Sequence, residues 1–384
     1  MTHRILVVGA GIAGLAAAVG LQRSGHDVTI VEERGDTSSG AGISIWPNAL
    51  AALDELGLGD AVRAAGGRVT AGAMRWHDGS WLRRPSAERI VTALGEPLVV
   101  VRRVVLMKLL ADALAVGTIE SGVAASALDT TESGVRVTLS DNTTRDADAV
   151  VGADGVGSLV ARQLNGTLNR RYAGYTAWRG VAAHELDPAL SGETVGSGTE
   201  FGHAPLGPDH TYWFATERGP EGRTSPEGEL AYLQWKYGSW ADPIPALLAA
   251  TNPADVLRND LYDRDEARQW AHGPIVLVGD AAHPMRPHLG QGGCQGLEDA
   301  AILAHCLGPT ADPATAFARF VAARRPRVRA LARESKLIGQ LVNVRPAFLG
   351  AVAMRASSLV PEAVLTRHLA SIAAGSAFVL PDLR

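Results

Sequence analysis

Three glycines near the start of the chain are spaced as in a phosphate-binding turn. The motif GAGIAG places Gly9, Gly11 and Gly14 between a short apolar run, residues 4–8, and an alanine-rich run. Glycine at these places permits a tight turn, a close approach of the backbone to a diphosphate, and close packing of a helix on a strand. The unpaired N–H groups and the dipole of that helix then favour an anion. The spacing therefore predicts that the chain binds a dinucleotide.

A carboxylate follows where the ribose of a dinucleotide would lie. Glu32 comes directly after the second apolar run, residues 27–31, at the end of the second predicted strand of a βαβ unit. At that place a carboxylate accepts hydrogen bonds from a ribose 2′-hydroxyl and repels a 2′-phosphate. The predicted dinucleotide is therefore FAD or NAD.

A second glycine-rich loop, far along the chain, favours FAD. The apolar run PIVLVGD ends at Asp280 and is followed by HLGQGGCQGLEDA, which has glycines at positions 290, 292, 293 and 296. The Asp280 carboxylate can bind a polyol hydroxyl, and the glycines allow the backbone to approach a flat ligand. The helix that begins beyond them can stabilise the negative charge of a reduced flavin.

These motifs require a parallel sheet that is interrupted by other elements. Buried-strand runs at 147–152 and 274–278 and a helical run at 104–115 suit the nucleotide domain, whereas Trp- and Arg-rich alternating segments predict an antiparallel sheet. We expect a discontinuous FAD-binding domain from 1–70, 98–170 and 268–310, a substrate-binding β-sheet domain from 71–97 and 171–267, and a C-terminal helical segment, 311–384. Within that segment, the helical pattern is expected to be interrupted at Pro326.

Composition narrows the partners to small molecules. The 384 residues carry a formal net charge of −4 and no long basic run, so neither nucleic acid nor an anionic membrane is an expected partner. The two cysteines, Cys294 and Cys306, predict no disulfide framework, and no apolar stretch is long enough for a membrane span. We expect a cytoplasmic protein. No spacing typical of a metal site or a nucleophile elbow is present, so no metal is expected.

The order of the motifs resembles one enzyme family. GAGIAG, GAGISIWPNALAAL, GADGVGS, GDAAHPM and GQGGCQGLEDA look like the motif set of the single-component (group A) FAD-dependent aromatic hydroxylases. The stretches GISIWPN, RRYAGYTAW and LGQGGC look closest to the branch of urate hydroxylase and of 6-hydroxynicotinate and salicylate monooxygenases. The resemblance implies an α/β fold, with a glutathione reductase-like Rossmann FAD-binding domain, an inserted antiparallel β-sheet substrate domain and C-terminal helices.

The resemblance also assigns residues to parts of FAD. It implies contacts with the adenosine diphosphate from Ala13, Glu32, Glu33 and Val123, with the ribitol from Asp280, and with the flavin ring from Ser44, Gly290, Gln291, Gly292, Gly293 and Cys294. An FAD-contacting arginine corresponds to Arg103, although Arg102 is its neighbour. Asp154, in GADG, either supports the pyrophosphate and a transient NAD(P)H or caps the turn that follows it.

The chemistry implied by the resemblance is monooxygenation. NADH or NADPH would reduce FAD, and dioxygen would form a flavin C4a-hydroperoxide that transfers one oxygen atom to a small, electron-rich aromatic or heteroaromatic substrate. In HTYWFATE, Tyr212 and Phe214 share one face of a strand and Trp213 takes the other. Tyr212, Arg179 and His203 are the candidate catalytic residues, and Tyr212, Glu200 and Pro287 are the candidate substrate residues.

One departure from the family bears on the substrate. Glu200 stands where the urate-type enzymes have a pocket arginine, so urate is a poor candidate and a neutral or cationic aromatic compound is favoured. A tetracycline-type or polycyclic natural-product oxygenase, a flavin oxidase or reductase, a flavin halogenase and a non-catalytic binder of FAD or aromatic compounds remain alternatives on the same fold. The C-terminal helices would either cover the substrate domain or form a homodimer contact.

Overall fold

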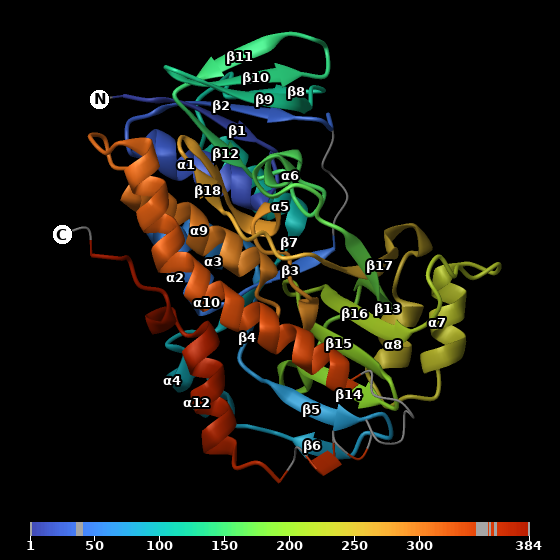
Figure 1. The fold of residues 1–384 in the computed structure, drawn as a ribbon. Coiled ribbons are helices and arrows are strands. Elements are labelled where there is room, and N and C mark those ends of the chain that lie inside the picture. The colour runs from blue at the N-terminus through green and yellow to red at the C-terminus, as the bar shows by residue number, and fades with distance from the viewer. Residues whose placement is uncertain (1, 36–40, 343–351, 353–354, 357–358, 383–384) are drawn as a thin grey trace.

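The computed structural model describes residues 2–35, 41–342, 352, 355–356 and 359–382 of the chain. Two β-sheets dominate it, a six-stranded sheet near the N-terminus and a seven-stranded sheet at the other end of the molecule (Figure 1). A long helix, α10 (Pro313–Val342), extends from the first sheet toward the second.

The six-stranded sheet is the nucleotide-binding sheet predicted from the sequence. Its strands in spatial order are β18 (Ala271–His272), β19 (Ile275–Leu277), β12 (Ala149–Gly152), β1 (Arg4–Val8), β2 (Asp27–Glu32) and β8 (Ile119–Ser121). All neighbours are parallel except β18, which pairs antiparallel with β19. Ile5 and Val7 enter the core shared with α1 (Ile12–Arg23) and α9 (Gly292–Cys306), whereas Leu6 and Val8 enter a second core. The prediction of a parallel sheet buried on both faces is confirmed.

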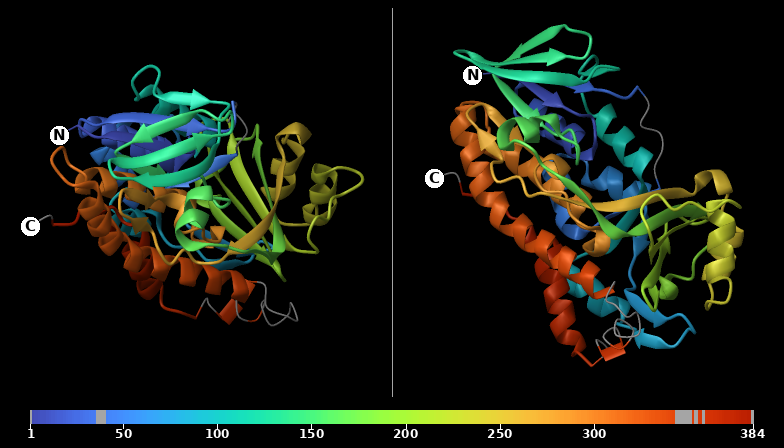
Figure 2. Two further views of the ribbon diagram at one scale, coloured as in Figure 1. Left: turned by 45° about the horizontal axis from the view of Figure 1, so that its top comes forward. Right: turned by 45° about the vertical axis from the view of Figure 1, so that its right-hand side comes forward.

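A three-stranded meander covers the second core. It consists of β9 (Ala125–Thr131), β10 (Gly134–Leu139) and β11 (Thr144–Ala147), and its buried Val135 and Val137 pack with Leu6 of β1. Figure 2 shows the meander at the end of the molecule away from the seven-stranded sheet.

The seven-stranded sheet forms the second body of the fold. Its strands in spatial order are β17 (Leu257–Arg264), β13 (Arg170–Ala182), β16 (Thr211–Arg218), β15 (Thr199–Pro205), β14 (Gly192–Gly196), β5 (Ala73–Trp76) and β6 (Trp81–Arg83). The expectation of a wholly antiparallel sheet needs one correction, because β14 and β5 are parallel neighbours. These two strands join segments that are far apart in sequence, so no hairpin forces them to be antiparallel. The intervals given above for the domains stay a prediction.

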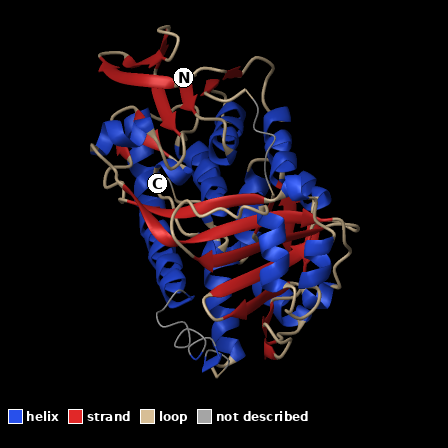
Figure 3. Cartoon of the chain, turned by 90° about the vertical axis from the view of Figure 1, so that its right-hand side faces the viewer, coloured by secondary structure: helices blue, strands red, loops and turns tan. Residues whose placement is uncertain are grey.

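Each face of this sheet has a different neighbour. The outer face packs against α7 (Glu229–Tyr237) and α8 (Ile244–Ala249) through Trp178, Trp213 and Leu233 (Figure 3). The inner face meets a small sheet of β3 (Gly42–Ile45), β7 (Leu98–Arg102) and β4 (Gly67–Val69), and Tyr212 and Val100 share the core between them.

The remaining helices surround these sheets. They are α2 (Pro47–Glu55), α3 (Gly59–Ala65), α4 (Ala87–Leu94), α5 (Arg103–Asp112), α6 (Leu159–Asn165) and α12 (Glu362–Ala373), with short 3₁₀ turns η1 (Pro188–Leu190), η2 (Pro253–Asp255), η3 (Gly279–Ala281), η4 (Pro287–Leu289) and η5 (Gly375–Ala377). Helix α10 packs against α9 and η4, and α12 packs against α4 and α2.

The predicted interruption at Pro326 is wrong, because α10 continues through it. Proline removes one backbone donor, but Phe320 before it and Val328 after it are both fully buried in the two cores of the nucleotide domain. Packing on both sides of the proline therefore maintains the helix.

Candidate functional site

The glycine turn after β1 has the geometry of a diphosphate cradle. Gly9 has φ of +103°, and a Cβ at Gly14 would lie 2.0 Å from the Gly9 oxygen. A Cβ at Gly11, by contrast, would have no heavy atom within 4 Å. Gly9 and Gly14 are thus required by the turn and by helix packing, whereas Gly11 leaves open space at the uncapped N-terminus of α1. That space can admit a diphosphate.

Glu32 is fixed beside this cradle. Its Oε2 accepts a hydrogen bond from the Ala10 N–H at 2.6 Å, and its Oε1 accepts one from the Arg34 N–H at 3.0 Å. A carboxylate has further lone pairs, so a ribose hydroxyl can still bind. Glu33 is exposed next to it, and the Val123 N–H donates to the Glu32 carbonyl oxygen at 3.1 Å. Only the carbonyl of the Val123 backbone is therefore free to accept from an adenine.

The two glycine motifs meet at Ala13. A Cβ at Gly279 would lie 2.6 Å from the Ala13 Cβ, and a Cβ at Gly296 would lie 3.1 Å from it. Ala13 thus packs between the turn that carries Asp280 and helix α9, and this contact brings both halves of the predicted FAD site together.

Asp280 and Arg103 are two accessible charges that act on each other. The Asp280 side chain is exposed, and no described residue hydrogen-bonds its carboxylate. Arg103 is exposed too, yet loss of hydration lowers its pKa, while Asp280 raises it and Arg179 lowers it further. Arg103 of α5 and Asp280 of η3 therefore lie where the flavin side of the site meets Arg179 of the seven-stranded sheet.

The glycine-rich loop offers main-chain donors. Helix α9 begins at Gly292, and its first hydrogen bond runs from the Gln295 N–H to the Gln291 oxygen at 2.8 Å. The N–H groups of Gly292, Gly293 and Cys294 therefore have no partner within the helix, and Gln291 provides no side-chain cap. They can donate to the anionic end of a flavin.

Two residues of this loop cannot face a flavin with their side chains. Gln291 is fully buried and exchanges hydrogen bonds with Asn48, whose Nδ2 lies 3.0 Å from its Oε1. Cys294 is also fully buried, and burial raises its pKa to about 12. Its Sγ lies 3.5 Å from the Ser44 oxygen. For Gln291 and Cys294 the expected ring contact is thus limited to the backbone, because their side chains fill the space beneath the loop.

Asp154 has the capping role that was one of its two alternatives. Its Oδ1 accepts from the Ser158 hydroxyl at 2.5 Å, and its Oδ2 accepts from the Leu159 N–H at 2.6 Å. Its backbone contacts the glycine turn, since a Cβ at Gly9 would lie 3.0 Å from the Asp154 Cα. Asp154 therefore packs its backbone against the glycine turn and caps the start of α6 with its carboxylate.

A buried ionic network that was not predicted from the sequence lies under this loop. Arg324 of α10 donates to Glu298 at 2.5 Å and to Asp299 at 2.7 Å. Arg327 donates to Glu298 at 3.0 Å, and His283 lies 2.5 Å from Asp299. The acids were visible in the motif GQGGCQGLEDA, but their arginine partners are on a separate helix. The network fixes α9 relative to GDAAHP.

The inner face of the seven-stranded sheet forms the opposite wall of the site. Tyr212 and Phe214 lie on it, and Trp213 lies on the outer face, as predicted. A Cβ at Gly42 of β3 would lie 2.6 Å from the Tyr212 ring, so the tyrosine rests directly on the flavin-side strand. Burial raises the Tyr212 pKa, and Arg179, which is paired in register with Phe214, opposes that shift.

Glu200 is on the same wall but already has partners. Its Oε1 accepts from the Thr216 hydroxyl at 3.0 Å and lies 3.5 Å from His288 Nδ1. The other ring nitrogen of His288 lies 2.8 Å from the Tyr175 hydroxyl. Pro287 precedes this histidine in η4, so the predicted substrate residues Glu200 and Pro287 come together. The chain Tyr175–His288–Glu200–Thr216 was not foreseen.

The proposed catalytic role of His203 is wrong. His203 is opposite Trp213 in the register of β15 and β16, so it lies on the outer face, away from Tyr212. Burial, assisted by Arg75, lowers its pKa to about 3. Neither ring nitrogen has a hydrogen-bond partner among the described residues. Because neighbouring residues on a strand point to opposite faces, a shift of one residue would be needed to bring His203 to the inner face.

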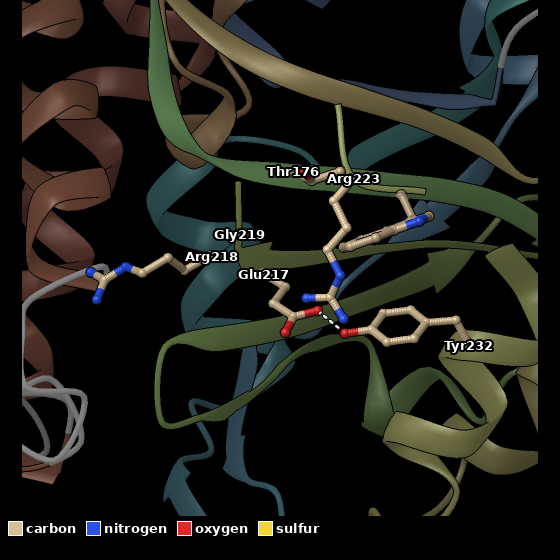
Figure 4. Close-up of a pocket in the computed structure, with 7 residues that line it drawn as sticks. Thr176, Glu217, Arg218, Gly219, Arg223 and Tyr232 are labelled. Carbon is tan, nitrogen blue, oxygen red and sulfur yellow. Dashed lines mark hydrogen bonds between the residues drawn. The ribbon is translucent and has the colours of Figure 1, made fainter. Parts of the chain in front are cut away.

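A separate pocket lies on that outer side (Figure 4). It is lined by Thr176, Glu217, Arg223 and Tyr232 among others, and its cavity volume is about 10 Å³. That volume accommodates about one water molecule and no aromatic ring. Among the described residues, no cluster of His, Cys, Asp or Glu could hold a metal ion, and no helix is long and apolar enough to cross a membrane.

Comparison with known proteins identifies the family. Residues 2–335 match the family model described as FAD binding domain, and the chain belongs to this family. It is 37% identical to the aurachin C monooxygenase/isomerase of Stigmatella aurantiaca, over 90% of this chain and 91% of the relative. It is 34% identical to the 3-amino-4-hydroxybenzoate 2-monooxygenase of Streptomyces cremeus, over 88% and 87%.

A solved structure shows the same architecture. The crystal structure of Klebsiella pneumoniae HpxO complexed with FAD and uric acid has a TM-score of 0.89 and 28% identity, and the match covers 96% of each chain. The chain is accordingly an FAD-dependent monooxygenase of the aromatic hydroxylase type, and the predicted resemblance is confirmed. FAD is its cofactor, and the open space at Gly11, the accessible Asp280 carboxylate and the N–H groups that begin α9 fit that cofactor. Hydroxylases of this type use NAD(P)H as reductant.

Proposed function

We propose that the protein uses NADH or NADPH and dioxygen to insert one oxygen atom into a small, electron-rich aromatic or heteroaromatic substrate. FAD, when bound, supplies the acceptor for reducing equivalents and the activation of oxygen. The protein supplies binding, orientation and the exclusion of water. The site has a single Rossmann motif, which supports a nicotinamide that binds transiently and leaves.

The contact between Gly42 and Tyr212 is the observation that carries this proposal. It places the strand that contains Ser44 against the inner wall of the seven-stranded sheet. The contact is so close that Gly42 could not carry a Cβ. Arg103, Asp280 and Arg179 act on one another electrostatically across the same boundary. A flavin held by Asp280 and α9 would therefore lie against a wall that carries an arginine and aromatic rings.

The side chains of this wall can prepare a substrate. The Tyr212 hydroxyl can bind a polar group of the substrate, and Arg179 can stabilise a negative charge left when a phenol or ring N–H loses a proton. Phe214 provides an apolar surface for a ring. These roles require contact with the substrate and no covalent step by the protein.

The names of the relatives support an aromatic substrate without fixing it. They specify aurachin C, 3-amino-4-hydroxybenzoate and, for the solved structure, uric acid. Glu200 still disfavours the anionic purine, because a carboxylate repels it. A polycyclic natural product is the second candidate, and aurachin C, named by the relative at 37% identity, is a compound to test alongside it.

The test begins with the yellow holoenzyme. We would measure NADH and NADPH oxidation with phenols, hydroxypyridines, uric acid, 3-amino-4-hydroxybenzoate and aurachin C, and follow labelled dioxygen into product by mass spectrometry. Acceleration by one compound together with one labelled oxygen atom in its product is expected. If no compound accelerates oxidation, or if label appears only in peroxide and water, the proposal fails.

A further inference from the structure

Two carboxylates face the same space from neighbouring strands. In the register of β14 and β15, Glu193 is opposite Gly202 and Glu200 is opposite Val195. Gly202 is in turn opposite Phe214, which is opposite Arg179. Because residues two apart on a strand share a face, Glu193 and Glu200 both lie on the inner wall that carries Arg179.

The two acids differ in their partners. Glu200 is buried and bound to Thr216 and His288. Glu193 makes no hydrogen bond or ion pair with any described residue, and its side chain keeps partial solvent access. Even so, loss of hydration, with a further effect of Glu200, raises the Glu193 pKa to about 8. Glu193 is therefore a half-buried, unpaired acid whose charged form is poorly hydrated.

The surroundings of Glu193 suit a flat ring. Opposite it, Gly202 has no side chain, and a Cβ there would lie 2.1 Å from Phe214 Cε1, so the phenylalanine ring covers this glycine. On the other side, Met74 of β5 is paired with Glu193. The carboxyl group thus stands between an aromatic and a thioether side chain, both of which pack well on aromatic faces.

We propose that Glu193 binds the hydrogen-bond-donating group of the aromatic substrate, a hydroxyl, ring N–H or amine, and selects against substrates with a carboxylate at that end. This inference rests on the proposed function and names the substrate class of the same site. It also assigns substrate contact to an acid other than Glu200, whose Oε1 already has Thr216 and His288 as partners.

The electrostatics explain the selection. Two acids in a poorly hydrated site repel each other when both are ionised. A bound donor or cation stabilises the ionised form of Glu193 and relieves that repulsion, whereas an anion near the ionised acids adds to it. An unpaired polar group in a buried site also makes an analogue that lacks the donor bind poorly.

The test uses the FAD holoenzyme and three probes, 2-aminophenol, anisole and benzoate. Binding would be measured from the change in the flavin absorption spectrum and compared with acceleration of NADPH oxidation. The wild type should bind 2-aminophenol more tightly than anisole, and benzoate least. Glu193→Gln should weaken the binding of 2-aminophenol by about 10- to 100-fold and change the binding of anisole little, with flavin content unchanged.

Two further variants act as controls. Glu185→Gln removes an exposed carboxylate outside the site and should bind like the wild type. Glu193→Asp keeps the acid and should recover part of the affinity. The inference is overturned if Glu193→Gln binds 2-aminophenol as the wild type does, or if the wild type shows no preference among the probes. If that happens but other aromatic compounds still accelerate NADPH oxidation, the proposed function holds and only the role of Glu193 is refuted.

Discussion

The charges of two acid pairs, Glu298 with Asp299 and Glu193 with Glu200, are compensated very differently. Glu298 and Asp299 are surrounded by Arg324, Arg327 and His283. Burial alone would raise the pKa of Asp299, but His283 and Arg324 lower it to about 2. In the second pair, Glu200 has one histidine beside it, and Glu193 has no partner among the described residues.

The difference separates a structural acid pair from a functional one. Every charge of the first pair is matched, so the pair holds α9 and α10 together and has no capacity for a ligand. The second pair lacks a matching charge, which costs stability and leaves a site that a donor can complete. Substitutions at each pair, at His203 and at the two walls of the site test this contrast.

Removing the central cation of the first pair should have the largest effect. Arg324→Ala leaves two buried carboxylates without their main partner and is expected to lower the free energy of unfolding by about 3–5 kcal/mol. Because the network supports the loop at Gly290, FAD should be lost as well. Urea unfolding and flavin content measure both effects. Arg319→Ala, an exposed change on the same helix, is the control, and equal stability of the two variants would refute the structural role.

His203 tests a buried group whose nearest charge has the same sign. Its pKa is about 3 in the folded protein, below its ordinary 6.5, so the unfolded chain binds more protons between these values. Stability from this group is therefore present above pH 6.5 and is lost as the pH falls. The wild type should lose about 2 kcal/mol of unfolding free energy from this group between pH 7.5 and 5, and His203→Leu should not show that loss. Urea unfolding midpoints at both pH values measure the difference. An unchanged acid profile would contradict this burial.

Glu193 should show the opposite dependence. Its folded pKa of about 8 exceeds the ordinary 4.5, so the folded state binds more protons between these values and stability falls as the pH rises. The full shift would be worth about 4 kcal/mol near pH 8, and the partial solvent access of Glu193 reduces it. Glu193→Gln should therefore be more stable than the wild type above pH 8, by about 1–2 kcal/mol, and the advantage should shrink toward pH 4.5. If the variant is destabilised equally at every pH, Glu193 is a structural residue.

Cofactor and substrate contacts should respond separately. Asp280→Asn removes the exposed charge on the flavin side of the site and should weaken FAD binding about tenfold. Flavin fluorescence on dilution measures this change. Tyr212→Phe should retain the yellow cofactor and change only substrate-stimulated NADPH oxidation. Equal loss of FAD in both variants would show that the two walls do not act independently.

The FAD-binding part of the molecule could be predicted from the sequence because its motifs depend on local geometry. The turn at Gly9, Gly11 and Gly14 and the carboxylate at Glu32 depend on neighbours close in the chain, so motif and structure agree. The assignments of Gln291 and Cys294 went too far, because a motif does not show which way a side chain turns. Pro326 was misread because tertiary packing on both sides outweighs one lost hydrogen bond.

The sheet half depended on pairing that no motif contains. Tyr212 and Trp213 were placed on the correct faces because alternation along a single strand is local. His203 was misplaced because its face depends on the register with a second strand, and a shift of one residue reverses it. Tyr175, Glu193 and His288 come from three distant segments, and nothing near any of them signals the other two.

The FAD-binding strand–turn–helix, the family and the class of chemistry could be inferred from sequence motifs, because glycine and carboxylate requirements act over a few residues. Which of the acids have counterions could be seen only in the folded chain. That outcome depends on burial and on partners from separate elements, as when Arg324 of α10 meets Asp299 of α9 while Glu193 meets no cation among the described residues. Both acid pairs lose hydration in the fold, and the cations that other elements bring to Glu298 and Asp299 distinguish that pair from Glu193.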